Sequence, residues 1–386
     1  MTLGFNSSIF SNHSSTIFTK TQYFVPYHSC TPHSKKYIFF LRKRVLRKAG
    51  FFLFSCSGII LNTKSGGHAF VGYYLARSLL QQKQAQVTLW NEGFEEQLKS
   101  SQPFSQYSDL KTLGINTIFS NCATESLNGS VKKCDWIIDN FSRDVETAKP
   151  LVEFASRIGV RQYLFVSSAG IYNANEMTPH FEDDPVNPQA PIFQTEEFLL
   201  SQPSFAVTCF RPIYLIGPRS AKTSYTDYFF DRIVRELKVP IPYPGDQLVS
   251  LSHVDDLVQM MILSIDKSDA FQQVFNATSG KFITFRALAD LCSQICCKPL
   301  QAFYYDAKLA RDSFSLFPFR NRHFIADPRK AERLLGWSSA TNLVENISQM
   351  FSEYLSLQKD KQNFSLDEDH KLWAAMECSG HLNARE

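Results

Sequence analysis

Two serines and a tyrosine follow a hydrophobic run near the middle of the chain, in "LFVSSAGIY". Ser167 and Ser168 end this run, and Tyr172 lies shortly after them. Hydroxyls at the end of a buried strand can hold a carbonyl while a tyrosine exchanges protons with it, chemistry that accompanies hydride transfer. Such a tyrosine needs a lysine four residues later to lower its pKa, but Glu176 occupies that position. Ser167, Ser168 and Tyr172 are therefore candidate catalytic residues without a complete acid/base pair.

The lysine required by this chemistry is also missing further along the chain. In reductases and epimerases of the extended short-chain type, the tyrosine and lysine would fall near residues 190 to 197, in "QAPIFQTEEF". No lysine occurs from residue 150 to residue 221, and no tyrosine from residue 173 to residue 213. Glu196 or Glu197 in the place of the lysine reverses the local charge. Conventional reductase chemistry is disfavoured.

A glycine-rich turn separates the first predicted strand from the first predicted helix, in "NTKSGGHAFVG". The spacing fits a G-x-x-G-x-x-G fingerprint in which alanine takes the middle place. The start of the helix would then direct unsatisfied N–H groups at a pyrophosphate, and an acidic residue after the second strand would accept a ribose hydroxyl. The candidate cofactor-binding residues are Gly66, Gly67, His68, Ala69, Gly72 and Glu92.

Carboxylates in two places are candidate ligands for a divalent metal. Asp139 ends the hydrophobic run "WIID", where it would lie at the ligand-binding edge of a parallel sheet, and is also a candidate catalytic residue. Asp183 and Asp184 belong to an acidic segment that begins at Glu182. Convergent carboxylates are what Mg²⁺ requires, but none of these spacings is diagnostic of a nuclease.

Basic and aromatic residues interleave in two segments. Arg232 and Arg235 occur in "FFDRIVRELK", and Arg320, Arg322 and His323 occur in "FPFRNRHF". Arginines that contact phosphates, with aromatic rings that stack on bases, would give such a pattern in an RNA-binding surface. The alternative is that these arginines pair with carboxylates and pack the C-terminal part of the chain against the rest.

The elements that must position these residues alternate between short hydrophobic runs and longer amphipathic ones. Strands are predicted over 57–63, 85–90, 116–120, 134–142, 161–170 and 206–217, and helices over 68–83 and 144–159. This alternation is typical of βαβ units. It predicts an α/β fold with a Rossmann-type, doubly wound parallel sheet, to which a smaller C-terminal lobe is added.

The predicted domain organisation has four parts. Residues 1–50 are read as a transit peptide, 57–217 as the nucleotide-binding domain, and 218–357 as the smaller lobe, some of whose strands and helices return to the main domain. Residues 358–386 are read as a loosely attached helix or tail. We expect the lobe to supply one wall of a cleft.

The N-terminal composition is that of an organelle transit peptide. Residues 1–50 hold eight of the 40 Lys and Arg residues, many Ser and Thr, and no acidic residue. The other 32 basic residues face 37 acidic ones, so the chain beyond residue 50 has a net charge of about −5. A secretory signal is disfavoured because its apolar core would start near residue 50. Composition alone leaves chloroplast and mitochondrion open.

A membrane span and a cysteine-based metal site are both disfavoured. The longest apolar run, "GFFLFSCSGIIL", has 12 residues, whereas a spanning helix needs about 20. None of the nine cysteines forms a C-x-x-C pair, so neither a zinc site nor a disulfide framework is indicated.

Four runs resemble a specific family: "NTKSGGHAFVG", "QYLFVSSAGIY", "YFFDRIVRELKVPIP" and "FRNRHFIADPRKAERLLGW". Together they are similar to the chloroplast stem-loop-binding proteins, atypical members of the short-chain dehydrogenase/reductase superfamily that bind and cleave RNA. The resemblance runs from about residue 57 to about residue 373. It implies a plastid location, binding of stem-loop and ribosomal RNA, contact with plastid ribosomal particles, and cleavage that depends on Mg²⁺ or another divalent metal.

Three hypotheses follow from these observations. The first is a plastid RNA-binding protein, with endoribonuclease activity that assists ribosomal RNA maturation; because the chain beyond residue 50 is acidic, its RNA surface must be a local patch. The second is an NAD(P)-dependent nucleotide-sugar epimerase or reductase. The third is a non-catalytic subunit that associates with ribosomes or senses nucleotides. Self-association is common in this superfamily, so a homo- or hetero-oligomer is a further expectation.

Overall fold

The computed structural model describes residues 56–63, 68–174, 178–220, 225–310 and 317–378. All of them belong to one of the two units of the chain, Leu53–Glu386. The predicted transit peptide lies outside the described residues, as do Gly66, Gly67 and Glu176.

Seven parallel strands form the central sheet: β1 (Ser57–Asn62), β2 (Gln86–Glu92), β3 (Asn116–Ser120), β4 (Trp136–Asn140), β5 (Gln162–Val166), β6 (Ala206–Pro212) and β11 (Gln273–Ala277). Their order is β11-β6-β5-β4-β1-β2-β3. The order reverses between β1 and β4, as in a doubly wound dinucleotide-binding fold. Residues in β4 and β5 are buried over the whole strand, because helices cover both faces of the sheet. The predicted fold class is confirmed.

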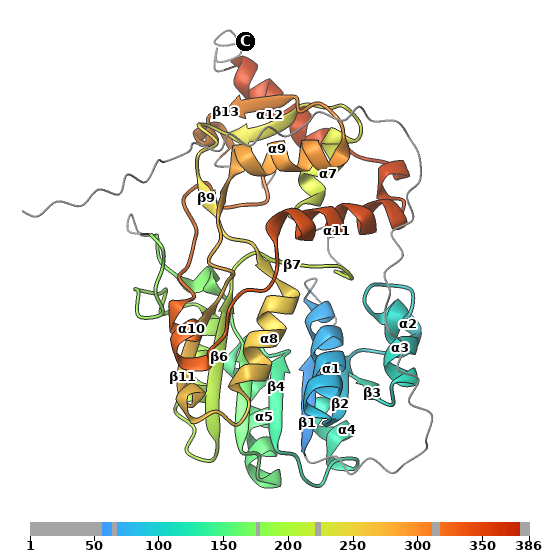
Figure 1. Cartoon of the computed structure of the whole chain (residues 1–386), viewed down its shortest axis with the longest axis vertical. Coiled ribbons are helices and arrows are strands. Elements are labelled where there is room, and N and C mark those ends of the chain that lie inside the picture. Colours follow the sequence, from blue (N-terminus) through green and yellow to red (C-terminus); the bar gives the residue numbers. More distant parts are fainter. Residues whose placement is uncertain (1–55, 64–67, 175–177, 221–224, 311–316, 379–386) are drawn as a thin grey trace, which may run out of the picture. The chain divides into compact units, whose positions relative to one another are not determined.

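The helices divide between the two faces of the sheet. One apolar core contains residues of α1 (Ala69–Lys83), α3 (Tyr107–Thr112), α8 (Val254–Ser264) and α10 (Arg329–Leu335). The core on the other face contains residues of α4 (Ala123–Asn128), α5 (Val145–Ile158) and α6 (Pro191–Leu200). In Figure 1, α1 and α8 lie side by side over one face. Elements far apart in the sequence therefore share one core.

Local signals explain where several of these helices begin and end. Asp144 caps the start of α5: its carboxylate accepts the N–H of Thr147, and the Thr147 hydroxyl in turn accepts the backbone N–H of Asp144. Gly159 ends the helix in a left-handed conformation. Gly72, in the first turn of α1, lies against β1, since a Cβ there would come within 2.5 Å of the Asn62 side chain. This glycine therefore permits the close approach of helix and strand.

A third apolar core forms the C-terminal lobe. It contains residues of α7 (Asp227–Ile233), α9 (Phe285–Cys296) and α11 (Leu343–Ser356). Two strands of the lobe, β8 (Val239–Pro242) and β13 (Ala302–Tyr305), pair in parallel. Figure 1 shows α7, α9 and α11 together, away from the seven-stranded sheet.

The C-terminal helix α12 (Asp367–Cys378) is more firmly attached than predicted. Its residues Leu372 and Met376 are buried in a small cluster with Tyr305, and Asp369 makes a buried ion pair with Arg232 of α7. Both contacts are long-range, so the polar sequence of the tail does not reveal them. Among the described residues, no helix is long and apolar enough to cross a membrane.

Candidate functional site

A pocket of about 310 Å³ opens where the central parallel strands end. Residues at or just after the ends of β1, β4, β5 and β6 contribute to its lining, because the carboxyl ends of parallel strands meet at one edge of the sheet. The pocket is lined by His68, Arg143, Val166, Ser167, Ser168, Ile192, Pro212, Tyr214, Leu215 and Tyr225. We call it the cleft pocket.

Of the predicted cofactor-binding residues that are described, only His68 lines the cleft pocket. Ala69 is buried, and its carbonyl accepts a hydrogen bond of 3.0 Å from Asn62 Nδ2. Gly72 faces Asn62 as described above. Glu92 ends β2, and its charge acts on the guanidinium of Arg143. Whether these residues hold a dinucleotide stays a prediction.

Three asparagines missed by the sequence reading bind the ends of the strands together. Asn62 Nδ2 donates to Asn91 Oδ1 at 3.0 Å, and Asn140 Nδ2 donates to Asn62 Oδ1 at 2.8 Å. These residues end or nearly end β1, β2 and β4, and all three are buried. The signal in the sequence was an asparagine after each hydrophobic run, a position that is polar in many strands for unrelated reasons.

Arg143 is the cation of the cleft pocket, and it too was missed. Its Nη1 donates to the carbonyl of Ser142 at 2.8 Å, and its Nη2 to that of Asn140 at 3.1 Å. Burial lowers the pKa of this guanidinium, while the charges of Asp139 and Glu92 raise it. Held in this way beside the start of α1, Arg143 can bind an anionic group such as a phosphate.

The two serines lie in the cleft pocket, whereas Tyr172 does not line it. Ser167 Oγ is buried and has no hydrogen-bond partner among the described residues, so it can bond to a ligand. Ser168 Oγ accepts from the N–H of Gly170 at 3.0 Å. The Tyr172 hydroxyl instead bonds to Asn276 Oδ1 at 2.7 Å, and burial raises its pKa well above the usual value. Tyr172 therefore does not act on a ligand in the cleft pocket.

The position predicted for the catalytic tyrosine and lysine is occupied by other side chains. Ile192 of α6 lines the cleft pocket, and Glu196 follows one turn later. Glu196 is buried and makes an ion pair of 2.6 Å with Arg211 of β6. Arg211 Nη1 also donates to the Tyr172 hydroxyl at 3.0 Å. The Glu196 carboxylate is therefore engaged in a buried network with Arg211 and Tyr172, and α6 presents no acid/base pair to the cleft pocket.

Asp139, predicted as a catalytic or metal-binding residue, has a structural function. Its Oδ1 accepts the N–H groups of Phe141 and Ser142, both at 2.8 Å, and its Oδ2 accepts the hydroxyl of Tyr163 at 2.7 Å. The residue is completely buried. It stabilises the turn that carries Arg143 and is not available to a metal ion, which corrects the prediction.

The acidic segment after His180 does not form a metal site either. Asp184 Oδ2 lies 3.0 Å from His180 Nδ1, and Asp183 lines a different pocket. Within the described part of the chain, no group of three or more His, Cys, Asp and Glu side chains is arranged to hold a metal ion. These residues do not fit the divalent metal implied by the resemblance, so we derive no step through such an ion.

The first basic segment is structural, contrary to the prediction for Arg232. The Arg232 side chain is 4% exposed and makes an ion pair of 2.8 Å with Asp369, and its guanidinium lies 3.9 Å from the centre of the Tyr228 ring. Arg235 bonds to the Tyr354 hydroxyl at 3.0 Å and to the carbonyls of Lys359 and Gln362. Both arginines attach the end of the chain to α7, and Arg232 cannot contact RNA.

The second basic segment lies at the rim of the cleft pocket. The backbone N–H of Arg320 donates to the Tyr214 hydroxyl at 2.9 Å, and Arg320 Nη2 donates to the carbonyl of Gly170 at 2.9 Å. Tyr214 lines the pocket. Arg322 is half-buried, and burial together with the charge of Arg320 lowers its pKa. His323 is exposed, and its Nδ1 accepts the N–H of Leu248.

Two aromatic residues of this segment do not face solvent. Phe319 and Phe324 are buried, Phe317 is half-buried, and the Arg320 guanidinium lies 4.6 Å from the centre of the Phe324 ring. The Phe324 ring lies under the arginines, so neither it nor Phe319 offers a free face for stacking. Phosphate contact by Arg320, Arg322 and His323 stays a prediction.

Comparisons with known proteins agree on the superfamily. The model of the NAD dependent epimerase/dehydratase family matches residues 65–277. The chloroplast stem-loop binding protein of 41 kDa b from Arabidopsis thaliana is 30% identical over 297 residues, which cover 74% of this chain and 77% of that protein.

Solved structures show the same fold at low identity. UDP-glucuronic acid 4-epimerase from Bacillus cereus is 14% identical, with a TM-score of 0.61, over 78% of this chain and 99% of that chain. UDP-glucose 4-epimerase from Thermotoga maritima is 20% identical, with a TM-score of 0.59, over 78% and 99%. An epimerase from Methanothermobacter thermautotrophicus is 17% identical, with a TM-score of 0.62, over 80% and 96%.

Proposed function

Because the chain belongs to the NAD-dependent epimerase/dehydratase family and, within that superfamily, to the chloroplast stem-loop-binding proteins, we propose that it is a plastid protein that binds stem-loop RNA. The observation that carries this proposal is the 30% identity, over three quarters of the chain, to a relative named for stem-loop binding. The acid-free, basic N-terminal 50 residues support the plastid location.

The geometry of the second basic segment supports this proposal. Arg320 is exposed at the rim of the cleft pocket, and within the described part of the chain its side chain donates a hydrogen bond to one acceptor, whereas a guanidinium carries five N–H groups. Arg143 lies in the same pocket. Arginines at the rim and in the lining of one concave site can contact successive phosphates of an RNA strand, although the chain beyond residue 50 is acidic.

A second candidate function is binding of a nicotinamide dinucleotide. The family match and the position of the cleft pocket at the switch point of the sheet favour it. Arg143 and the start of α1 fit a phosphate group, and Ser167 Oγ fits a further polar contact. A bound dinucleotide would supply hydride chemistry. Its usual tyrosine and lysine are absent, because Ile192 lines the pocket at this place and Glu196 is paired with Arg211.

RNA cleavage, a divalent metal requirement and association with plastid ribosomal particles are proposals that rest on the resemblance alone. If the protein cleaves RNA, the product should appear only with Mg²⁺. If it is a non-catalytic subunit, it should retain RNA without cleaving it.

A single gel experiment tests these alternatives. The full chain is incubated with a stem-loop RNA at low salt, in Mg²⁺ or EDTA, with and without NADP⁺. We expect a shifted band whose intensity falls steeply as salt rises, because binding releases counterions from the phosphates. Cleavage in Mg²⁺ supports the nuclease, a shift without cleavage supports the non-catalytic subunit, and competition by NADP⁺ assigns the RNA to the cleft pocket. Absence of a shift at low salt contradicts the proposed function.

A further inference from the structure

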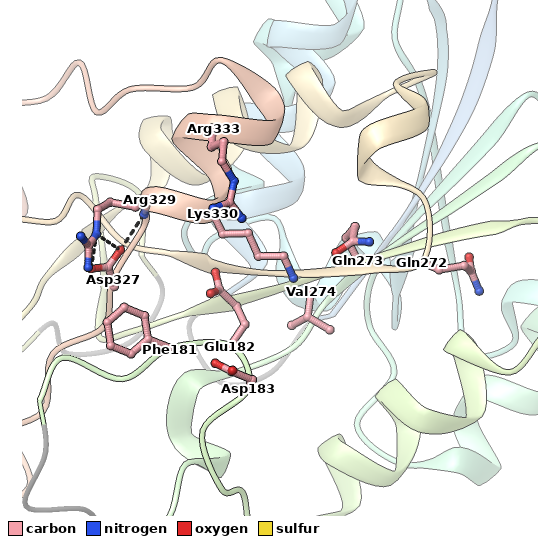
Figure 2. A pocket seen from close by; sticks show the side chains of 10 residues that line it. All are labelled: Phe181, Glu182, Asp183, Gln272, Gln273, Val274, Asp327, Arg329, Lys330 and Arg333. Carbon is pink, nitrogen blue, oxygen red and sulfur yellow. Dashed lines mark hydrogen bonds and ion pairs between the residues drawn. The ribbon is translucent and has the colours of Figure 1, made fainter.

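A larger concave site lies at the edge of the sheet, apart from the cleft pocket. It has a volume of about 610 Å³ and shares no lining residue with the cleft pocket. Its walls come from the edge strand β11, the segment 181–183 and the first turns of α10 (Figure 2). We call it the edge pocket. Its size is that of sites that hold a small organic ligand.

One wall of the edge pocket is cationic. Arg329 is neutralised locally, since its Nε lies 2.8 Å from Asp327 Oδ2 and 3.0 Å from Asp327 Oδ1. Lys330 and Arg333 are the other cations of this wall; burial lowers the pKa of Lys330, and the charge of Arg333 lowers it further. In Figure 2 the Lys330 side chain points into the space above Glu182. An anion placed between Lys330 and Arg333 would relieve their repulsion.

The opposite wall is acidic. Glu182 Oε1 accepts the N–H of Asn276 at 2.8 Å, which fixes its carboxylate beneath Lys330. Burial raises the pKa of Glu182 and lowers that of Lys330, while each charge favours the ionised form of the other. Asp183 is exposed beside Glu182. Two carboxylates facing a lysine do not make a cation site, but they can accept hydroxyl groups.

An aromatic ring and an amide complete the edge pocket. Phe181 is 40% exposed, an unusual position for a phenylalanine. The Arg329 guanidinium lies 5.7 Å from the centre of the Phe181 ring. Gln273 of β11 adds an amide to the lining. Cations, carboxylates, an aromatic ring and an amide in one cavity match the phosphate, ribose hydroxyls and base of a nucleotide.

We propose that the edge pocket binds one ribonucleoside monophosphate unit. Lys330 and Arg333 contact the phosphate, Glu182 or Asp183 accepts the ribose hydroxyls, and the base lies against Phe181. The unit is either a free nucleotide or an unpaired nucleotide of a bound RNA. The second source rests on the proposed function, whereas the first does not.

The ligand class is tested with the full chain by equilibrium dialysis or calorimetry. AMP, GMP, CMP and UMP are compared with dAMP and with inorganic phosphate. We expect saturable binding of at least one ribonucleotide, with dAMP weaker than AMP because it lacks one hydroxyl, and phosphate weaker still. Equal binding of inorganic phosphate and AMP would overturn the assignment to a nucleotide.

Two substitutions at exposed positions test the place of binding. Arg333→Glu and Phe181→Ala should each weaken nucleotide binding about tenfold or more, through loss of a charge-assisted contact or of stacking. Arg286→Glu, a charge reversal at an exposed position of α9, is the matched control and should leave binding unchanged. Thermal unfolding of each variant verifies that it is folded.

Stem-loop RNA with an unpaired loop, compared with a fully paired duplex, separates the two sources. Weaker stem-loop binding in Arg333→Glu assigns the edge pocket to an RNA nucleotide, and unchanged stem-loop binding with lost AMP binding assigns it to free nucleotides. A protein that binds AMP but no RNA refutes the proposed function and leaves this inference standing. If no nucleotide binds and the two substitutions leave stem-loop binding intact, the inference is refuted.

Discussion

The segments 228–235 and 317–324 both alternate arginines with aromatic side chains, yet their arginines have different surroundings. Arg232 is buried against Asp369 of α12, and Arg235 holds the backbone beyond α11. Arg320 and Arg322 both lie over the ring of the buried Phe324 at the rim of the cleft pocket. The difference arises because α12 and its preceding loop cover the first segment, whereas the described residues place no carboxylate against Arg320. Interleaved arginines and aromatic rings therefore do not by themselves identify an RNA surface.

The largest expected effect comes from breaking the buried ion pair of the first segment. Arg232→Ala should lower the free energy of unfolding by about 3–5 kcal/mol, because it leaves the Asp369 carboxylate buried and unpaired. Urea unfolding followed by circular dichroism measures this loss. The double variant Arg232→Met/Asp369→Leu removes both charges and should recover much of the stability. A single variant as stable as the wild-type protein would show that α12 is not held by this pair.

Arg235 should show a smaller effect of the same kind. Arg235→Ala removes hydrogen bonds to Tyr354 and to two backbone carbonyls, and we expect a loss of about 2 kcal/mol in the free energy of unfolding. RNA affinity, measured on the folded protein, should not change. A large loss of RNA affinity with unchanged stability would instead show that Arg235 contacts RNA, and the two segments would then not differ in function.

The second segment should respond in the opposite way. Arg320→Glu should weaken stem-loop binding about tenfold at low salt, through loss of a phosphate contact and charge reversal, with a smaller difference at high salt. Its free energy of unfolding should change little, since one side-chain hydrogen bond to Gly170 is lost. Filter binding over a salt series measures the effect. Lys149→Glu, an equivalent charge reversal on α5, is the control, and equal losses in both variants would point to net charge alone.

The smallest expected effect is a pH dependence of stability that arises from His180, next to the second segment. His180 lies beneath it, 5.7 Å from the Phe324 ring. Burial lowers the pKa of His180, the neighbouring Asp184 raises it, and the charges of Arg322 and Arg320 lower it further. The unfolded chain therefore binds this proton more readily, so stability is present above the ordinary histidine pKa of 6.5 and is lost as pH falls below it.

The imidazole can be followed directly. In Arg320→Glu the His180 pKa should rise, because a repelling charge becomes an attracting one, and the loss of stability below pH 6.5 should become shallower. Nuclear magnetic resonance titration of the His180 ring measures the shift. An unchanged pKa would show that Arg320 does not act on the core beneath it.

The candidate site was predictable in part. Ser167 and Ser168 were placed correctly at the end of a buried strand, and His68 at the start of α1, because hydrophobic runs and glycine turns are local signals. Arg143 and Tyr214 were missed, since nothing in their neighbourhoods differs from an ordinary loop. Asp139 was misread because a carboxylate after a strand can brace its own turn as readily as it can bind a ligand.

By itself the sequence determined the order of strands and helices, the doubly wound sheet, the missing lysine and the family. Each of these depends on patterns within a few turns of chain or on the presence of a residue type anywhere in a long span. Only the tertiary structure decided which charged side chains are engaged in ion pairs within the protein. Glu196 meets Arg211 across 15 residues and Arg232 meets Asp369 across 137, whereas Lys330 and Glu182 converge on a cavity from different elements. Burial and pairing are properties of such long-range contacts, so a charged residue reveals its function only when its partners are in place.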